Sequence, residues 1–324
     1  MPFTAPLQPG QGFIQAAHYL PASIDNVLWG RLPCAADTAV LTIDSGDEVT
    51  IDTLSHEGVL EDQGRDPAAF FAGHGVAREN VLDDAIALAA SGYQRDSKID
   101  GPHVVTGPIR IRGAKPGDLL KMTVLEATPR VPYGVISNRH GRGALPGEYP
   151  LVEGPVSVFA AVDDADGGQV GTLPLVAGGE RSVRFPLRPF LGIMGVAVSG
   201  STRPHSVPPG PHGGNIDINL LTAGSSLYLP VQVDGALAYV GDPHFAQGDG
   251  EVALTAMEAS LRVTVRFEVV PQGEALAAFG TLVGPLAETQ EFLVPTGMDE
   301  DLDEAVRRCV RAAISLLHAR YGMD

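Results

Sequence analysis

Glycine and proline are unusually frequent in this chain, with 39 glycines and 26 prolines, about a fifth of its 324 residues. Glycine supplies the positive φ angles that tight turns need, and proline fixes φ while removing a hydrogen-bond donor. This composition excludes a coiled coil or a long helical bundle and favours many short strands joined by turns. The length suits one large or two ordinary domains, and we expect a β-rich N-terminal domain over residues 1–190 and a second β-rich and α+β domain over residues 191–324.

Tight turns followed by alternating residues predict strand pairs. Ser45-Gly46-Asp47 and Pro116-Gly117-Asp118 each lead into such a run. In the run Leu261–Val270 the apolar residues occupy one face and polar residues such as Arg262 and Thr264 the other, which predicts one packed and one wet side. Other predicted strands are Ala39–Ile43, Val49–Leu54, Val104–Ile111, Leu119–Leu125, Val156–Ala161, Ser182–Leu187 and Ser226–Val233.

Helical patterns are fewer. Asp66-Pro67 is typical of a helix N-terminus, and residues 80–90 carry apolar side chains at helical spacing. The clearest helix lies near the C-terminus, where one apolar stripe predicts a buried face that includes Cys309. Members of that stripe are Leu302, Ala305, Val306, Cys309, Val310, Ala313, Leu316 and Leu317. The glycine- and proline-rich segments 129–155 and 192–214 are predicted to be long ordered loops.

The charge balance excludes several classes of partner. With 22 basic and 39 acidic residues the formal net charge is −17, which repels nucleic acids and anionic membrane surfaces. Residues 1–15 lack the basic start and apolar stretch of an export signal. Cys34 and Cys309 lie far apart and form no metal-binding pair motif. We therefore predict a cytoplasmic protein without nucleic-acid or membrane partners.

The densest polar segment is the run 241–251, GDPHFAQGDGE. It combines the carboxylates of Asp242, Asp249 and Glu251 with the imidazole of His244 and the amide of Gln247 among glycines. Such a mixture can wrap a divalent cation. The alternative is a solvated turn, in which glycine and aspartate are common, but a turn requires neither His244 nor Glu251.

Two further segments carry candidate ligands. In Gly213-Gly214-Asn215-Ile216-Asp217 the paired glycines permit close approach of the backbone, and Asn215 and Asp217 share one face if the segment is extended. The alternative is an Asx turn in which Asn215 bonds its own backbone. His56 follows a predicted strand, where a hydrogen-bonded packing role is the alternative to metal binding.

Together these segments resemble the acetamidase/formamidase family. The resemblance rests on GGNID at residues 213–217, on GSSLYLPV at 224–231 and on the run 241–251, in that order and spacing. GIMGVA at 192–197, VTGPI at 105–109 and the Pro116-Gly117-Asp118 turn also match. It implies a mainly β, sandwich- or barrel-like fold with a smaller α+β part, and hydrolysis of a small carboxamide such as formamide or acetamide to carboxylate and ammonia. It further implies a homo-oligomer and a metal-dependent hydrolase, with zinc as the expected metal and calcium as the alternative.

The resemblance and the side-chain chemistry suggest roles for individual residues. Asp217, His244 and His56 would hold the metal, and Glu251 or Asp242 would move the proton of the attacking water. The N–H groups of Gly213, Gly214 and Gly248 are candidates for stabilising the oxyanion, and Asn215 and Gln247 for contacting substrate. If these roles hold, Asp217 and His244 converge within a few ångströms on one concave site.

Two alternatives remain open at this point. One is a hydrolase of the same fold that acts on a larger or cyclic amide. The other is a non-catalytic, calcium-stabilised β-rich binding module, in which the run 241–251 holds a structural cation and activates no water.

Overall fold

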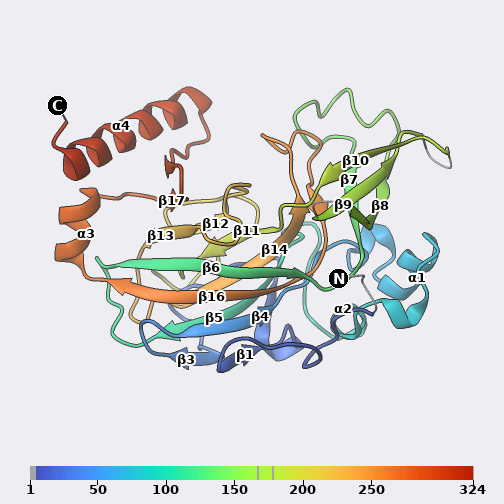
Figure 1. Ribbon diagram of the computed structural model, residues 1–324, viewed down its shortest axis with the longest axis horizontal. Helices are drawn as coiled ribbons and strands as arrows, with labels where there is room; N and C mark the ends of the chain where they lie inside the picture. Colours follow the sequence, from blue (N-terminus) through green and yellow to red (C-terminus); the bar gives the residue numbers. More distant parts are fainter. Residues whose placement is uncertain (1–4, 166–167, 177–178, 324) are drawn as a thin grey trace.

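Two β-sheets dominate the computed structural model, which describes residues 5–165, 168–176 and 179–323 (Figure 1). The first sheet contains, in spatial order, β1 (His18–Leu20), β4 (Glu48–Asp52), β16 (Leu261–Val270), β6 (Leu119–Pro129), β13 (Ser226–Pro230), β17 (Leu286–Glu288) and β18 (Leu293–Pro295). Its central pair, β16 and β6, is antiparallel along its whole length.

The second sheet surrounds strand β14. Its main path is β10 (Ser182–Pro186), β9 (Gly168–Pro174), β8 (Pro155–Ala165), β7 (Tyr133–Arg139), β15 (Met257–Glu258), β14 (Ala238–Ala246), β11 (Phe190–Gly195) and β12 (Gly213–Asn215). A branch through β5 (Val104–Ile111) adds β2 (Val27–Trp29) and β3 (Leu41–Ile43). The strands β8, β9 and β10 extend away from the body of the molecule (Figure 1).

Both sheets contribute to one hydrophobic core. Val49 of β4 and Val263 of β16 belong to the same buried cluster as Ile109 of β5, Met194 of β11 and Val240 of β14. The predicted mainly β, sandwich-like architecture is therefore confirmed. The boundary between residues 190 and 191 stays a prediction.

The two turn motifs fold as predicted, for the same physical reason. Gly46 and Gly117 each have φ of +98°, which a residue with a side chain rarely adopts. The aspartate after each glycine closes its turn, because the Asp47 carboxylate accepts from Asp44 N–H and the Asp118 carboxylate from Lys115 N–H, both at 2.9 Å.

Three predictions, two about loops and one about a strand face, were wrong in part. The segments expected to be long loops contain β7 and parts of β11 and β12, because glycines in them pack against neighbouring strands instead of opening the chain. On the polar face of β16, Arg262 and Thr264 are buried, whereas Arg266 and Glu268 are partly exposed as predicted. The Arg262 guanidinium can be buried because it forms a bidentate ion pair with the Asp52 carboxylate of β4, at 2.7 and 2.9 Å.

The helices lie at the periphery. They are α1 (Pro67–Ala72), α2 (Asp83–Ala90), α3 (Gln272–Phe279) and α4 (Leu302–Tyr321), with short 3-10 turns η1 (Ile24–Asn26), η2 (Glu61–Gln63) and η3 (Arg78–Asn80). As predicted, Asp66 caps α1, accepting a hydrogen bond from Ala69 N–H at 3.1 Å ahead of Pro67. Within the described residues no helix combines the length and apolar character needed to cross a membrane.

The predicted buried stripe of α4 is largely wrong. Leu316 is buried, but Cys309 is only half-buried, and four members of the stripe are exposed. These four are Leu302, Val306, Val310 and Leu317. The reason is that α4 lies beside α3 and β18 at one end of the molecule (Figure 1). Only a narrow face of α4 therefore packs against the rest of the protein.

A buried arginine joins four separate parts of the chain. Arg130 is inaccessible to solvent, and its Nε and Nη1 donate to the carbonyls of Leu7 and Thr53 at 3.0 and 3.1 Å. Its Nη2 lies 2.9 Å from the Asp84 carboxylate at the start of α2 and 3.7 Å from that of Asp52. Removing the guanidinium would leave buried carboxylates uncompensated.

We predict that Arg130→Met lowers the free energy of unfolding by about 3–5 kcal/mol, because Asp84 then stays buried without its partner. Urea titration measures this loss. Arg112→Met is the matched control, because Arg112 pairs with Asp44 in an exposed bridge at 2.9 Å and its loss costs under about 1 kcal/mol. Equal losses for the two variants would contradict the structural role of Arg130.

Candidate active site

A cavity of about 410 Å³ is lined by five of the candidate residues, although His244 itself is not in its wall. Its wall includes His56, Asp217, Asp242, Glu251 and Asn215, all named from the sequence. It also includes His103 and Glu258, which the sequence analysis missed. We call the set His56, His103, Asp217, Asp242, His244, Glu251 and Glu258 the donor cluster.

Strand β14 positions the centre of the donor cluster. Asp242 and His244 are two positions apart on β14 and therefore lie on the same face of the strand. Neighbouring strands supply the next side chains, because β14 pairs with β5, which His103 directly precedes, and with β15, which ends at Glu258. Within these pairings His244 lies opposite Glu258.

The remaining cluster members come from loops beside these strands. His56 follows β4, Asp217 follows β12, and Glu251 lies in the connection from β14 to β15. The β11 strand anchors Asp217, whose N–H donates to the carbonyl of Gly192 at 3.2 Å. The cluster is thus drawn from segments scattered from residue 56 to residue 258.

Asp242 is the hub of the cluster. Its carboxylate lies 3.2 Å from His244 Nε2, 3.4 Å from His56 Nδ1 and 3.8 Å from His103 Nε2. Glu258 lies 3.1 Å from His244 Nε2 and 3.9 Å from His56 Nδ1.

Potential ligand atoms converge in three overlapping groups. Within each group the atoms lie within 4.8 Å of one another. The groups are His56, His103 and Asp242; Asp242, His244 and Glu258; and Asp217, His244 and Glu251. The predicted convergence of Asp217 and His244 is therefore confirmed as geometry.

One ring nitrogen of each of the three imidazoles contacts a residue outside the cluster. His244 Nδ1 bonds Gln247 Oε1 at 3.0 Å, and His103 Nδ1 bonds Ser206 Oγ at 3.0 Å. His56 Nε2 lies 3.4 Å from the buried carboxylate of Glu57. The opposite nitrogen of each ring points into the cluster, which is the arrangement of metal-binding histidines.

Several inward-pointing atoms have no hydrogen-bond partner. Among the residues that the structure describes, the buried atoms without one include His56 Nδ1, Asp217 Oδ1, Asp242 Oδ1, His244 Nε2 and Glu258 Oε2. Buried polar atoms are ordinarily satisfied, so five such atoms in one place need a partner. A divalent cation bound by nitrogen and oxygen donors fits this set.

The buried carboxylates of the cluster also favour a bound cation. Burial, and after it the charge of Asp242, raises the pKa of Asp217 to about 7. Burial, and after it the charge of Asp217, raises the pKa of Glu251 to about 9. Burial opposes ionisation of Asp242 as well, but His103 and His244 hold its pKa well below its usual range. Asp242 is thus the ionised member, while Asp217 and Glu251 compete for protons.

Three carboxylates of the cluster sit on strained backbone. Asp217, Asp242 and Glu251 have φ of 46°, 49° and 45°, in the left-handed region that residues other than glycine rarely enter. Such strain persists only where the surrounding structure imposes it and is common at functional sites.

Gly192 marks the middle of the cluster. A Cβ added there would lie 2.6 Å from Asp217 Oδ1, 2.7 Å from His244 Cε1 and 2.8 Å from Asp242 Oδ2. The space in front of this strand residue is therefore the point at which the three side chains meet.

The other residues named from the sequence lie around the cluster. Gln247 joins two of its members, because Oε1 faces His244 and Nε2 donates to the Asp217 carbonyl at 2.8 Å. Gly213 and Gly214 belong to β12, and Gly213 N–H donates to the Gly210 carbonyl at 2.9 Å, so it is already satisfied. Gly248 lines a neighbouring cavity.

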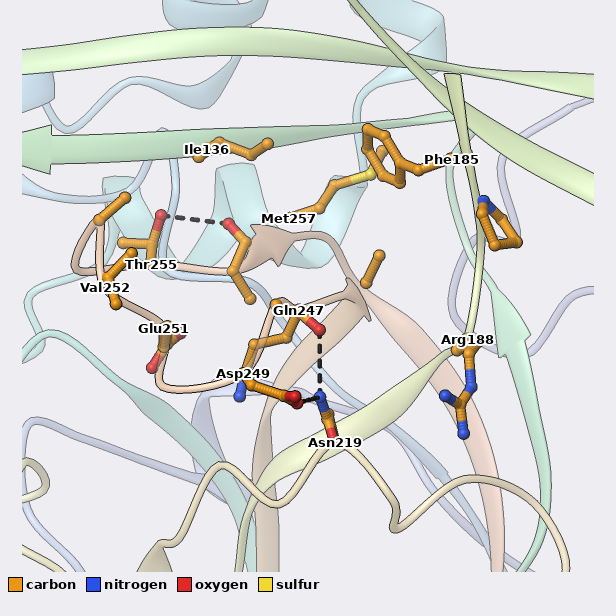
Figure 2. Close-up of a pocket in the computed structure, with 15 residues that line it drawn as sticks. Ile136, Phe185, Arg188, Asn219, Gln247, Asp249, Glu251, Val252, Thr255 and Met257 are labelled. Atoms are coloured by element: carbon orange, nitrogen blue, oxygen red, sulfur yellow. Dashed lines mark hydrogen bonds between the residues drawn. The ribbon is translucent and has the colours of Figure 1, made fainter. Parts of the chain in front are cut away.

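That neighbouring cavity is about 480 Å³ in volume and shares Glu251 and Thr255 with the first. Figure 2 shows Ile136, Met257 and Phe185 along one side of it and Gln247, Asp249 and Asn219 along the other. Asn219 Nδ2 bonds the Asp249 carboxylate at 2.9 Å and the Gln247 carbonyl at 3.2 Å, which anchors the loop that carries Glu251.

The missed residues carried weak signals in the sequence. Glu258 is an acid within the apolar run Ala256-Met257-Glu258-Ala259, and a charge at a buried position usually has a partner. His103 directly precedes a predicted strand, and His56 lies two positions after the end of another. Neither signal identifies the other members, because their proximity depends on how the strands pair.

Comparison with known proteins identifies relatives. A family model described as the acetamidase/formamidase family matches residues 83–205 and 200–324. The acetamidase of Mycolicibacterium smegmatis is 27% identical over 248 residues, which cover 59% of this chain and 59% of the relative. The formamidase of Methylophilus methylotrophus is 28% identical over 225 residues, covering 55% and 54%. The matched region thus spans little more than half the length of these relatives.

A solved structure shares the fold. The crystal structure of a predicted acetamidase/formamidase from the thermophile Thermoanaerobacter tengcongensis superposes with a TM-score of 0.68 at 27% identity. The superposition covers 93% of this chain and 82% of the other. The architecture described above is therefore similar to that structure over nearly its whole extent.

We predict that Gly192→Ala weakens binding of a divalent cation at least tenfold, because the new methyl group occupies the meeting point of Asp217, Asp242 and His244. Titration of the metal-free protein with zinc measures the affinity. Gly92→Ala is the control, because a Cβ there has no described atom within 4 Å. Unchanged zinc affinity in Gly192→Ala would show that the cation binds elsewhere.

A second prediction concerns Glu57, which accepts from Ser137 Oγ and Gln63 Nε2, both at 2.5 Å, beside His56. Glu57→Gln should weaken zinc binding by about 10- to 100-fold, because the amide no longer fixes the orientation and protonation of the ring. Zinc titration and circular dichroism, read together, test this. Full affinity in a folded variant would contradict the role.

Proposed function

The chain belongs to the acetamidase/formamidase family, and on that premise we propose that it hydrolyses a small carboxamide to a carboxylate and ammonia. The observation that carries the proposal is the donor cluster, most of which lines a cavity of about 410 Å³. An amide carbonyl is a poor electrophile, so its hydrolysis needs activation of both the carbonyl and the water.

A divalent cation is part of the proposal, with zinc expected from the mixed imidazole and carboxylate donors. His56, His103, Asp242, His244 and Glu258 would hold it, with Asp217 at the edge of the set. When bound, such an ion polarises a carbonyl oxygen and lowers the pKa of water toward about 7. Asp242 and His244 each belong to two of the three ligand groups, so both are central to the proposed set.

Glu251 is the proposed proton carrier. Its raised pKa of about 9 means that it holds a proton more readily than an exposed glutamate does, as a group that delivers one to a leaving nitrogen must. Asp242, the other candidate from the sequence, is surrounded by three imidazoles and stays ionised, which suits a ligand. We therefore assign proton transfer to Glu251 and metal binding to Asp242.

Asn215 is the proposed contact for the substrate amide. It lines the cavity, and its Oδ1 is buried without a hydrogen-bond partner among the described residues. An acceptor in that position can take a hydrogen bond from the NH₂ group of a carboxamide. Gln247 would act indirectly, by holding His244 and the backbone of Asp217 in place.

We also propose a homo-oligomer that acts in the cytoplasm. The exposed apolar side chains of α4, such as Val310 at 52% and Ile314 at 59%, support association, because a large apolar patch is rarely left in water. The two free cysteines are compatible with a reducing compartment. Sedimentation analysis of the purified protein tests the oligomeric state.

Glu251→Gln should retain the metal and lower the rate of ammonia release by about 10²- to 10⁴-fold, because the amide cannot carry the proton. Metal analysis of the purified variant and an ammonia assay with formamide and acetamide measure the two effects. Glu148→Gln, at an exposed position away from both cavities, is the matched control.

The same experiment separates the proposed enzyme from a binding module. Calcium in place of zinc, together with no ammonia release from any amide, would favour a calcium-stabilised module. Normal turnover in Glu251→Gln would remove Glu251 as the proton carrier.

A further inference from the structure

The outer wall of the active-site cavity carries a group of cations in an otherwise acidic protein. Arg95 and Lys98 line it from one segment, and Arg139 and Arg142 from another. The chain has only 22 basic residues against 39 acidic ones. Seven carboxylates line the same cavity, but four of them belong to the donor cluster, so only Glu61, Asp62 and Asp100 accompany these four cations.

The acidic groups at this mouth are already paired. Glu61 pairs with Arg95, Asp62 with Arg139 at 2.6 Å, and Asp100 with Arg31 at 2.6 Å.

Two of the cations have no partner. In the described part of the chain, no hydrogen bond or ion pair involves the side chains of Lys98 and Arg142, both of which are exposed. The mouth therefore presents two uncompensated positive charges to whatever enters the cavity.

The electrostatics of a neighbouring histidine agree with this. His205 lines the same cavity, and its pKa is lowered first by burial and then by the positive charge of Arg31, with Arg142 adding to the effect. Asp100 acts in the opposite direction but does not reverse the shift. Arg31 and Arg142 therefore both act as positive charges at His205.

The cavity is also larger than the smallest amides require. A water molecule occupies about 30 Å³ in the liquid, so acetamide, with four heavy atoms, needs on the order of 100 Å³. The cavity measures about 410 Å³. A substrate whose amide lies at the donor cluster has room for a chain that extends toward the mouth.

We propose that the substrate is a carboxamide with a carboxylate at its far end, that is, the monoamide of a short dicarboxylic acid. The amide lies at the donor cluster, and Lys98 and Arg142 attract the distal carboxylate. This rests on the proposed amidase function. In the reaction, water forms a C–O bond to the carbonyl carbon, the C–N bond breaks, and protons from water and the acid group pass to nitrogen, giving a dicarboxylate and ammonium.

The test compares two pairs of substrates of equal size. Glutaramate and succinamate carry the distal carboxylate, whereas glutaramide and succinamide replace it with a neutral amide of the same shape. Ammonia release measures kcat/KM for each. We expect the anionic member of one pair to be favoured about tenfold, mainly through KM, and this preference to shrink as the salt concentration rises.

The variants Lys98→Met and Arg142→Met remove the two unpaired cations without breaking an ion pair. In the double variant the preference should fall to within about twofold, while kcat/KM for the neutral diamide stays unchanged. Lys115→Met is the matched control, because it removes one exposed lysine from a turn outside the cavity. It should preserve the preference.

Every result decides the proposal. Equal rates for anionic and neutral substrates in the wild type, or a preference that survives in the double variant, would overturn the carboxylate subsite and leave the amidase function standing. Hydrolysis of formamide or acetamide but of none of the longer amides would do the same. Failure of every amide, short or long, would overturn both.

Discussion

The burial of four carboxylates beside three imidazoles is the constraint on which the site depends. Burial alone disfavours ionised carboxylates, and Asp217, Asp242, Glu251 and Glu258 also repel one another. Protons or a cation must compensate this charge. The five unpartnered atoms that point inward identify where compensation is needed, and their mixed nitrogen and oxygen chemistry favours a divalent metal ion.

The fold meets this constraint by placing Asp242, His244 and Glu258 on paired strands and the other donors on adjoining segments. Asp242 and His244 sit on β14, which is hydrogen-bonded on both edges, and each imidazole of the cluster has a neighbour outside it that fixes its orientation. Glu251 differs, because it lies on a connecting loop between two cavities. A strand for Asp242 and His244 and a loop for the proposed proton carrier give these groups different structural support.

Local patterns in the sequence predicted much of the scaffold. Strands β5 and β16 have the predicted bounds, because alternation and flanking turns are local properties. Local sequence patterns failed to predict burial where it depends on which elements pack against a residue. Arg262 faces a buried aspartate and is covered, whereas Val310 has the composition of a core residue and is exposed, since no element covers that face of α4.

The sequence alone determined the β-rich class, the tight turns and the chemistry of the segments around Asp217 and His244, since these follow from glycine, proline and side-chain type at short range. Tertiary structure alone decided that His103 and Glu258 join them and that Asp242 becomes the hub. Strand pairing between β14, β5 and β15 brings these residues together across up to 155 positions of chain, and no periodicity in one dimension encodes which strands become neighbours.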